Sequence, residues 1–200
     1  MKTISILLTA LLLLGASLNV NGQVTNETEE TPYEKATKAS NFSMDYVIFY
    51  APTIDERPVG SDILAGNIVV YVYGNTECAS CIGLGRAIAD AKREKYNKNK
   101  DVKFVYFTTD NKAAIKRLIS IPDIKYDYVV SLPFEKLVDI GFMMAYKPTY
   151  VVVDRSGKVV AKGIGCSHIT EEAKKTFDEK IGAEIDKLLN VKAVDGTGTM

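Results

Sequence analysis

The alternation of apolar and polar positions along the chain predicts strands and helices in turn. Runs of β-branched and aromatic residues at 67–75 and 102–109 are typical of buried strands. Between these runs, from 82 to 96, apolar residues recur near a helical period and are separated by charged ones, which indicates an amphipathic helix. The segment 112–121 has the same pattern and ends at Pro122.

The second half of the chain continues this series. Residues 133–141 predict a short helix that ends at a glycine, and residues 149–154 and 158–163 predict a β-hairpin around a short turn. From 168 to 189, apolar residues fall on one face of a helix that would pack against the rest of the domain. This order of elements predicts an α/β fold with a central mixed β-sheet flanked by helices.

The N-terminal residues have the pattern of a secretory signal peptide. Lys2 precedes an apolar run of eleven residues from Ile4 to Leu14, and small and polar residues follow. A membrane span needs roughly 20 apolar residues, so the run is too short for one. We therefore expect residues 1–22 to be a signal peptide and the protein to be exported, periplasmic or secreted, with no stable membrane insertion after signal cleavage.

Composition places the remaining boundaries and narrows the class of partner. Residues 23–40 are polar and charged, which predicts a flexible leader, and residues 191–200 predict a polar tail after a single domain at 41–190. The chain of 200 residues carries 25 basic and 25 acidic side chains, and its lysines are scattered. Because this distribution forms no basic stripe, we expect small polar or neutral molecules or proteins as partners and no nucleic acid.

Two of the three cysteines, Cys78 and Cys81, are separated only by Ala79 and Ser80. In an exported protein, such a pair is a redox-active dithiol, part of a metal site or a structural disulfide. A structural disulfide is a poor explanation, because closing so short a loop stabilises a chain little. The pair lies where a buried strand leads into a helix, and N–H groups at a helix N-terminus stabilise a thiolate. We therefore expect Cys78 to be the nucleophile and Cys81 the resolving thiol.

Longer motifs around this pair resemble a known family. The segments LAGNIVVYVYGNTECASC, VKFVYFTTD and YKPTYVVVDRSGKVVAKG look like the thioredoxin-like fold, in particular the exported thiol–disulfide oxidoreductases of the thioredoxin/TlpA type. The resemblance implies that Cys78 attacks, that Cys81 resolves, and that Pro148 is a cis-proline facing the pair, with Lys147 and Thr149 beside it in the substrate-binding site. It also implies protein disulfide or thiol substrates, an unidentified electron donor and no cofactor.

The chain departs from the pattern of this family near the cysteines. Glu77 replaces the usual tryptophan, and Val72 and Leu84 stand where relatives have acidic residues. Proton transfer must then use Glu77, a tyrosine or water. Lys147 would favour a thiolate if it pointed at the sulfur, whereas Glu77 would disfavour one, so charge alone leaves the direction of electron flow open. The resemblance to the TlpA type implies a reductase.

Two other functions occur on the same fold. A peroxide-reducing redoxin has Thr three residues before its reactive Cys and a Pro further upstream, whereas here Thr76 is two residues before Cys78 and no Pro lies nearby. A Sco-like copper-binding or assembly protein would use Cys78, Cys81 and His168, and thiolates suit Cu(I). The two cysteines of this chain are one residue closer together than in the Sco pattern. We therefore expect thiol–disulfide chemistry, with copper binding as the alternative.

The third cysteine, Cys166, follows the last predicted strand. In a thioredoxin-like fold this strand runs parallel to the one before Cys78, so Cys166 is expected at the rim of the same site. It would be a third redox thiol, a substrate contact, a partner in an intermolecular disulfide or an ordinary buried residue. Free cysteines are among the most buried residue types, and we therefore expect the last of these.

Overall fold

The computed structural model describes residues 44–142 and 147–190. The predicted signal peptide at 1–22, the leader at 23–40 and the tail at 191–200 lie outside these residues, as do the first residues of the predicted domain. Within the described ranges, no helix has both the length and the apolar character needed to cross a membrane.

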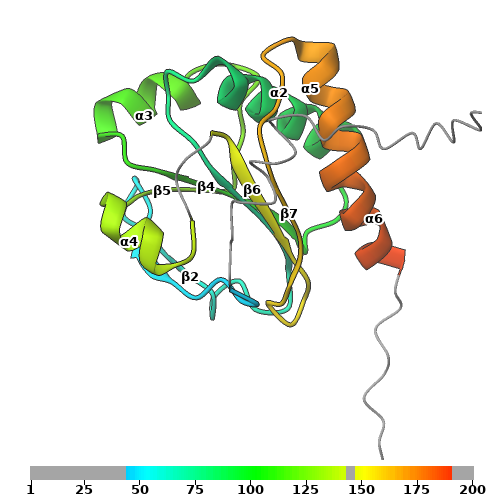
Figure 1. Cartoon of the computed structure of the whole chain (residues 1–200), viewed down its shortest axis with the longest axis horizontal. Coiled ribbons are helices and arrows are strands. Elements are labelled where there is room, and N and C mark those ends of the chain that lie inside the picture. Colours follow the sequence, from blue (N-terminus) through cyan, green and yellow to red (C-terminus); the bar gives the residue numbers. More distant parts are fainter. Residues whose placement is uncertain (1–43, 143–146, 191–200) are drawn as a thin grey trace, which may run out of the picture.

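A five-stranded mixed β-sheet forms the centre of the molecule (Figure 1), with the strand order β5-β4-β3-β6-β7. The three strands β3, β4 and β5 run parallel to one another, β6 is antiparallel to β3, and β7 is antiparallel to β6. The strand bounds are Ile68–Tyr73 for β3, Val102–Thr108 for β4, Tyr128–Ser131 for β5, Thr149–Val153 for β6 and Val159–Ile164 for β7.

Helices connect and cover these strands, and a small hairpin precedes them. The helices are α2 (Ala79–Glu94), α3 (Lys112–Ile119), α4 (Phe134–Asp139), α5 (Thr170–Thr176), the π-helical segment η1 (Phe177–Gly182) and α6 (Ala183–Asn190). The hairpin pairs β1 (Tyr50–Pro52) with β2 (Pro58–Gly60).

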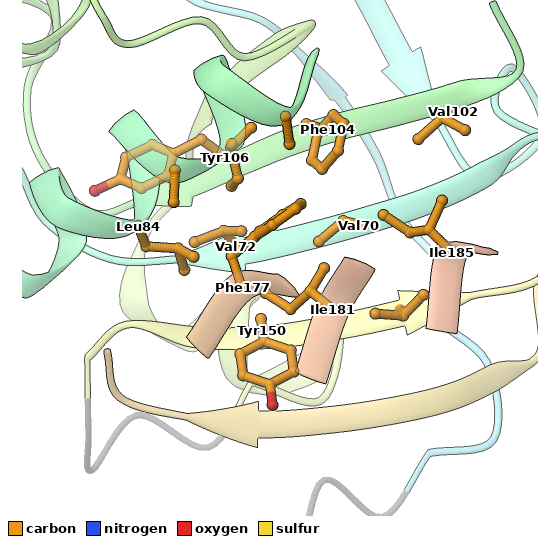
Figure 2. Packing of buried hydrophobic residues seen from close by; sticks show 14 of the residues in the cluster. Val70, Val72, Leu84, Val102, Phe104, Tyr106, Tyr150, Phe177, Ile181 and Ile185 are labelled. Carbon is orange, nitrogen blue, oxygen red and sulfur yellow. The ribbon is translucent and has the colours of Figure 1, made fainter. Parts of the chain in front are cut away.

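The sheet has an apolar core on each face, because side chains of a strand alternate between its two faces. On one face, α2, α3 and the terminal helical run from α5 to α6 pack against the core residues that Figure 2 shows. These include Val70 and Val72 of β3 and Phe104 and Tyr106 of β4. On the other face, α4 and the segment around β1 and β2 cover the alternate strand residues, Tyr71 and Val105 among them.

The predicted fold class is confirmed, and most predicted elements occur within a few residues of their expected bounds. Strand β5 and the β1–β2 hairpin were not predicted from the sequence. Strand β5 has only four residues, and it is held by parallel pairing with β4, which local sequence does not reveal. The predicted terminal helix is present, although the π-helical segment interrupts its α-helical geometry.

Four of these elements converge at one edge of the sheet. The parallel strands β3 and β4 end there, and the antiparallel β6 begins there, because Tyr73 at the end of β3 pairs with Thr149 at the start of β6. Helix α2 starts a few residues after β3 ends. Residues far apart in the sequence therefore meet around the N-terminus of α2.

Candidate active site

Cys78 caps the N-terminus of α2. Its backbone is extended, and its carbonyl accepts the hydrogen bond from Ile82 N–H at 3.0 Å that opens the helix. The Cys78 sulfur accepts a hydrogen bond from the backbone N–H of Cys81 at 3.2 Å. A side chain at this position satisfies an N–H that has no partner inside the helix, and the donors there suit an anionic sulfur.

The second cysteine lies behind the first. Cys81 is 2% exposed, whereas Cys78 is half-buried, and both thiols are free. Burial raises the pKa of the Cys81 thiol above its ordinary value, and the hydrogen bond that it shares with Cys78 acts in the same direction. The Cys78 sulfur is therefore accessible to a substrate, whereas the Cys81 sulfur is shielded in the interior.

Gly74, which follows β3, lets the buried sulfur approach the backbone. A methyl group on Gly74 would lie 2.8 Å from the Cys81 Sγ and 2.8 Å from the hydroxyl oxygen of Tyr106. Contacts this short leave no room for any side chain. The Gly74 N–H continues the sheet by donating to the Phe107 carbonyl at 3.0 Å. Glycine at this position keeps the sulfur and the phenol against the end of the sheet.

The segment before β6 faces the cysteine pair, as the family resemblance implied. The Lys147–Pro148 peptide bond is cis. The Cys78 thiol lies 4.0 Å from the Lys147 carbonyl oxygen, to which it donates, although the two residues are 69 positions apart. Pro148 and Thr149 are buried at the start of β6. The structure thus places Lys147, Pro148 and Thr149 at the same edge of the sheet as Cys78.

The two charged side chains that the sequence analysis weighed have different surroundings. The Lys147 Nζ lies 5.4 Å from the centroid of the Tyr73 ring, which is a cation–π contact. Its charge slightly opposes the effect of burial on the pKa of Cys81. The Glu77 side chain is exposed to solvent. The cation is thus held by an aromatic ring at the site, and the carboxylate lies in water, where charges are well screened.

The sequence analysis did not identify Asp110, which holds the loop that carries Cys78. The Asp110 Oδ2 accepts a hydrogen bond from the backbone N–H of Thr76 at 2.5 Å. Its carbonyl accepts another from the Ser131 hydroxyl at 2.7 Å, at the end of β5. The available signal was its position just after a predicted strand, because parallel strands end at the same edge of a sheet.

Cys166 lies close to the cysteine pair but in a different environment. It is half-buried against the core beside α2, and its thiol donates to the Ala173 carbonyl at 3.9 Å. Burial raises the pKa of the Cys166 thiol to about 11. The prediction that Cys166 is a buried residue is therefore confirmed only in part, because the side chain is half-buried.

The structure also places His168, which the copper-binding alternative requires. Its side chain is exposed, and its Cα lies 3.4 Å from the position that a Cβ on Gly83 would take. Among residues 44–142 and 147–190, no three His, Cys, Asp or Glu side chains are grouped so that they could hold a metal ion. Cys78, Cys81 and His168 do not form such a group.

Comparison with known proteins gives matches in structure only. No protein-family model matches the sequence, and no curated protein matches it. A candidate thioredoxin from Neisseria meningitidis has a TM-score of 0.58 at 17% identity, over 76% of this chain and 94% of that protein. A candidate thiol:disulfide interchange protein, DsbE, from Chlorobium tepidum has a TM-score of 0.57 at 20% identity, over 70% of this chain and 94% of that protein.

A third match belongs to the family named in the copper-binding alternative. It is a SCO1/SenC family lipoprotein from Bacillus anthracis, with a TM-score of 0.54 at 20% identity, over 73% of this chain and 96% of that protein. At such low identities the likeness concerns architecture. The mixed five-stranded sheet, the helices on both of its faces and these matches together establish that the chain has the thioredoxin-like fold.

Proposed function

We propose that this protein is an exported thiol–disulfide oxidoreductase in which Cys78 is the attacking nucleophile and Cys81 the resolving thiol. The observation that carries the proposal is the arrangement of the two sulfurs. Cys78 is partly exposed at the N-terminus of α2, and Cys81 is buried directly behind it, with its N–H bonded to the Cys78 sulfur. An accessible thiolate backed by a shielded second thiol is the arrangement that two-step disulfide exchange requires.

The chemistry follows from that arrangement. In the reductive direction, the Cys78 thiolate attacks a substrate disulfide, forms a mixed disulfide and releases one substrate thiol. Cys81 then loses its proton and attacks the Cys78 sulfur, and the second substrate thiol leaves. The protein is left with a Cys78–Cys81 disulfide, which an external dithiol must reduce before the next cycle.

Protein disulfides or thiols are the proposed substrates, with Lys147, Pro148 and Thr149 as the substrate-binding residues. The Lys147 carbonyl lies beside the Cys78 sulfur, where the backbone of a bound peptide would pass. Two structural neighbours are named as thiol:disulfide interchange proteins, which supports this substrate class. We propose reduction as the direction, with an electron donor still to be identified, no cofactor and no nucleic-acid partner.

Export belongs to the same proposal. Residues 1–22 would be the signal peptide, 23–40 a leader, 41–190 the catalytic domain and 191–200 a tail. The short apolar run after Lys2 supports this division, and one structural neighbour is named as a lipoprotein. A periplasmic or secreted location would expose the dithiol to proteins that contain disulfides.

A copper-assembly function is the second candidate, because a SCO1/SenC family protein shares the fold. It has less support, since His168 does not form a potential metal-binding group with the two cysteines. Titration of the reduced protein with Cu(I) separates the two functions. Tight stoichiometric binding that is lost in both Cys78→Ser and His168→Ala would favour the copper function.

Single serine substitutions test the proposed roles. Cys78→Ser should abolish reduction of a disulfide-bonded protein substrate, with dithiothreitol as the electron donor, because no attacking thiol remains. Cys81→Ser should accumulate mixed disulfides between Cys78 and the substrate, since only resolution is lost. Non-reducing gels and intact-protein mass spectrometry would detect these adducts.

Cys166→Ser is the matched control, because it removes a half-buried thiol and leaves the pair intact. It should keep most of the activity. Substantial turnover by Cys78→Ser, or equal trapping through Cys166, would refute the assignment of the nucleophile.

A further inference from the structure

The surroundings of Cys81 contain no buried acid. Val72 and Leu84, where the family resemblance led us to look for an acidic residue, are apolar and almost completely buried in the same cluster. Throughout the described ranges, no Asp, Glu, Lys, Arg or His residue is buried. A resolving thiol must nevertheless become a thiolate before it attacks. In this apolar setting the charged sulfur needs a polar partner.

Tyr106 supplies a polar group at this place. It belongs to the face of β4 that packs under α2, and Figure 2 shows its ring at the end of the core. Its hydroxyl oxygen and the Cys81 Sγ both lie 2.8 Å from the point where a Gly74 Cβ would be. The hydroxyl is buried, and it has no hydrogen-bond partner in the part of the chain that the structure describes.

A second tyrosine lies beside the first. The rings of Tyr106 and Tyr126 have centroids 4.8 Å apart, and the Tyr126 hydroxyl is also buried without a partner among the described residues. An unsatisfied buried hydroxyl has a cost in free energy, and folded proteins usually avoid it. Two such hydroxyls next to a buried reactive sulfur indicate that a hydrogen-bond acceptor for them forms only in another state of the site.

The other titratable groups that act on this cluster come from several elements. Cys78 lies at the start of α2, and Lys147 precedes β6 with its ammonium on the Tyr73 ring. Asp110 follows β4 and is bonded to the Thr76 N–H, and Cys166 acts on Tyr126 from the segment after β7. Within the described ranges, the hydroxyl groups of Tyr106 and Tyr126 are buried and have no hydrogen-bond partner. None of the other groups named here has a buried side-chain oxygen or nitrogen in this condition.

We propose that the Tyr106 hydroxyl donates a hydrogen bond to the Cys81 sulfur when that sulfur becomes a thiolate, and so promotes the resolving step. The inference rests on the proposed function and deepens it, because it names the group that stabilises the second thiolate. Tyr126 packs against the Tyr106 ring and holds it in position.

The step balances without a further reactant. Cys81 gives up its proton to water, and its thiolate forms a bond to the Cys78 sulfur of the mixed disulfide. The bond between Cys78 and the substrate sulfur breaks, and its electron pair leaves with the substrate thiolate, which takes up a proton from water. Tyr106 keeps its own proton throughout, because burial raises the pKa of its hydroxyl far above the ordinary value. It therefore acts as a neutral donor and not as a base.

Stopped-flow oxidation by dithiobis(nitrobenzoate) resolves the two steps in the reduced Cys166→Ser protein. Attack by Cys78 releases a first nitrothiobenzoate at a rate that depends on reagent concentration. Attack by Cys81 releases the second at a rate that does not. Tyr106→Phe should slow the second release about tenfold or more, because a hydrogen bond to a charged group is lost. The pH midpoint of this step should rise by about one unit.

The first release should be unchanged in Tyr106→Phe, because the donor to the Cys78 sulfur is the backbone N–H of Cys81, which the substitution leaves in place. Tyr71→Phe is the matched control: it removes a hydroxyl from a buried tyrosine on the opposite face of the sheet. It should leave both releases and their pH dependence as they are. A circular-dichroism melt of each variant accompanies the kinetics.

An unchanged second release in Tyr106→Phe would overturn the inference while leaving the proposed function intact. Equal slowing of both releases, with the same loss in the Tyr71→Phe control, would also overturn it, since that result indicates general damage to the core. Absence of the first release in the parent protein would instead contradict the proposed function itself.

Discussion

At the scale of single residues, the surroundings of the three thiols separate them. The Cys78 sulfur accepts a hydrogen bond from the backbone N–H of Cys81. Cys81 is enclosed by apolar groups and the Tyr106 phenol, and Cys166 is half-buried beside Ala173. Because reactivity of a cysteine follows its thiolate fraction and its exposure, these surroundings predict different rates of chemical modification.

Cys166 should react slowly with iodoacetamide in a Cys78→Ser/Cys81→Ser protein, where it is the remaining cysteine. Its pKa of about 11 leaves it protonated at pH 8, whereas a thiol in an unfolded chain has a pKa near 8.5. The rate at pH 8 should be about 100-fold below that of the same protein in denaturant, and should rise as the pH approaches about 11. Alkylation followed by mass spectrometry gives both rates.

A native rate equal to the denatured rate would show that Cys166 is an accessible, reactive thiol. It would return the third cysteine to the candidates for a redox role.

The cysteine pair and the segment Lys147–Thr149 were predicted from motifs, whereas two residues placed by strand pairing alone were not. Cys78 and Cys81 were found because the strand-to-helix junction is a local pattern. Tyr106 lies in β4 and Asp110 follows that strand, and their positions depend on the parallel pairing of β3 with β4. One sequence shows a tyrosine inside a strand, but it does not show which sulfur the hydroxyl will face.

At the scale of elements, the start of α2 is held against the segment that links β7 to α5. A methyl group on Gly83 would lie 2.5 Å from the carbonyl oxygen of Ser167, which is far inside van der Waals contact. A glycine inside a helix weakens it, so its presence early in α2 needs a reason. The structure supplies the reason for Gly83, because only a glycine permits this close approach.

Gly83→Ala should therefore destabilise the protein, by about 1–3 kcal/mol, because the backbone of α2 and the carbonyl of Ser167 must move apart. Urea unfolding followed by circular dichroism measures the change in the free energy of unfolding. Gly182→Ala is the control, since its nearest neighbours lie at 3.5 Å, an ordinary contact distance. It should be neutral or stabilising by up to about 1 kcal/mol. Equal effects of the two substitutions on the free energy of unfolding would mean that the close approach at Gly83 does not determine stability.

The elements that were missed share a dependence on tertiary contacts. Strand β5 pairs with β4, and β1 and β2 pair with each other, in three residues each. The π-helical geometry of η1 occurs where Phe177 and Ile181 are buried against the sheet. The longer elements, whose periodicity alone reports the buried face, were predicted because their pattern does not depend on a partner.

At the scale of the whole molecule, the topology assembles a site from segments that are distant in sequence. The ends of β3 and β4, the start of β6 and the N-terminus of α2 meet at one edge of the sheet. The cis bond before Pro148 and its closeness to Cys78 were expected from the motif, and both are observed. The topology thus explains why the accessible thiol of Cys78 and the buried thiol of Cys81 lie next to the segment that contains Pro148.

The central claim is that Cys78 and Cys81 form a reversible redox couple, and an equilibrium redox titration tests it most directly. The Cys166→Ser protein would be equilibrated in buffers of graded dithiol and disulfide content, quenched with acid and alkylated, and its free thiols counted by mass spectrometry. We predict a single two-electron transition between a dithiol and an intramolecular disulfide, with a reduction potential nearer to about −270 mV, typical of a reductant, than to about −120 mV, typical of an oxidant. If no disulfide between Cys78 and Cys81 formed at any ratio of dithiol to disulfide, this result would contradict the account.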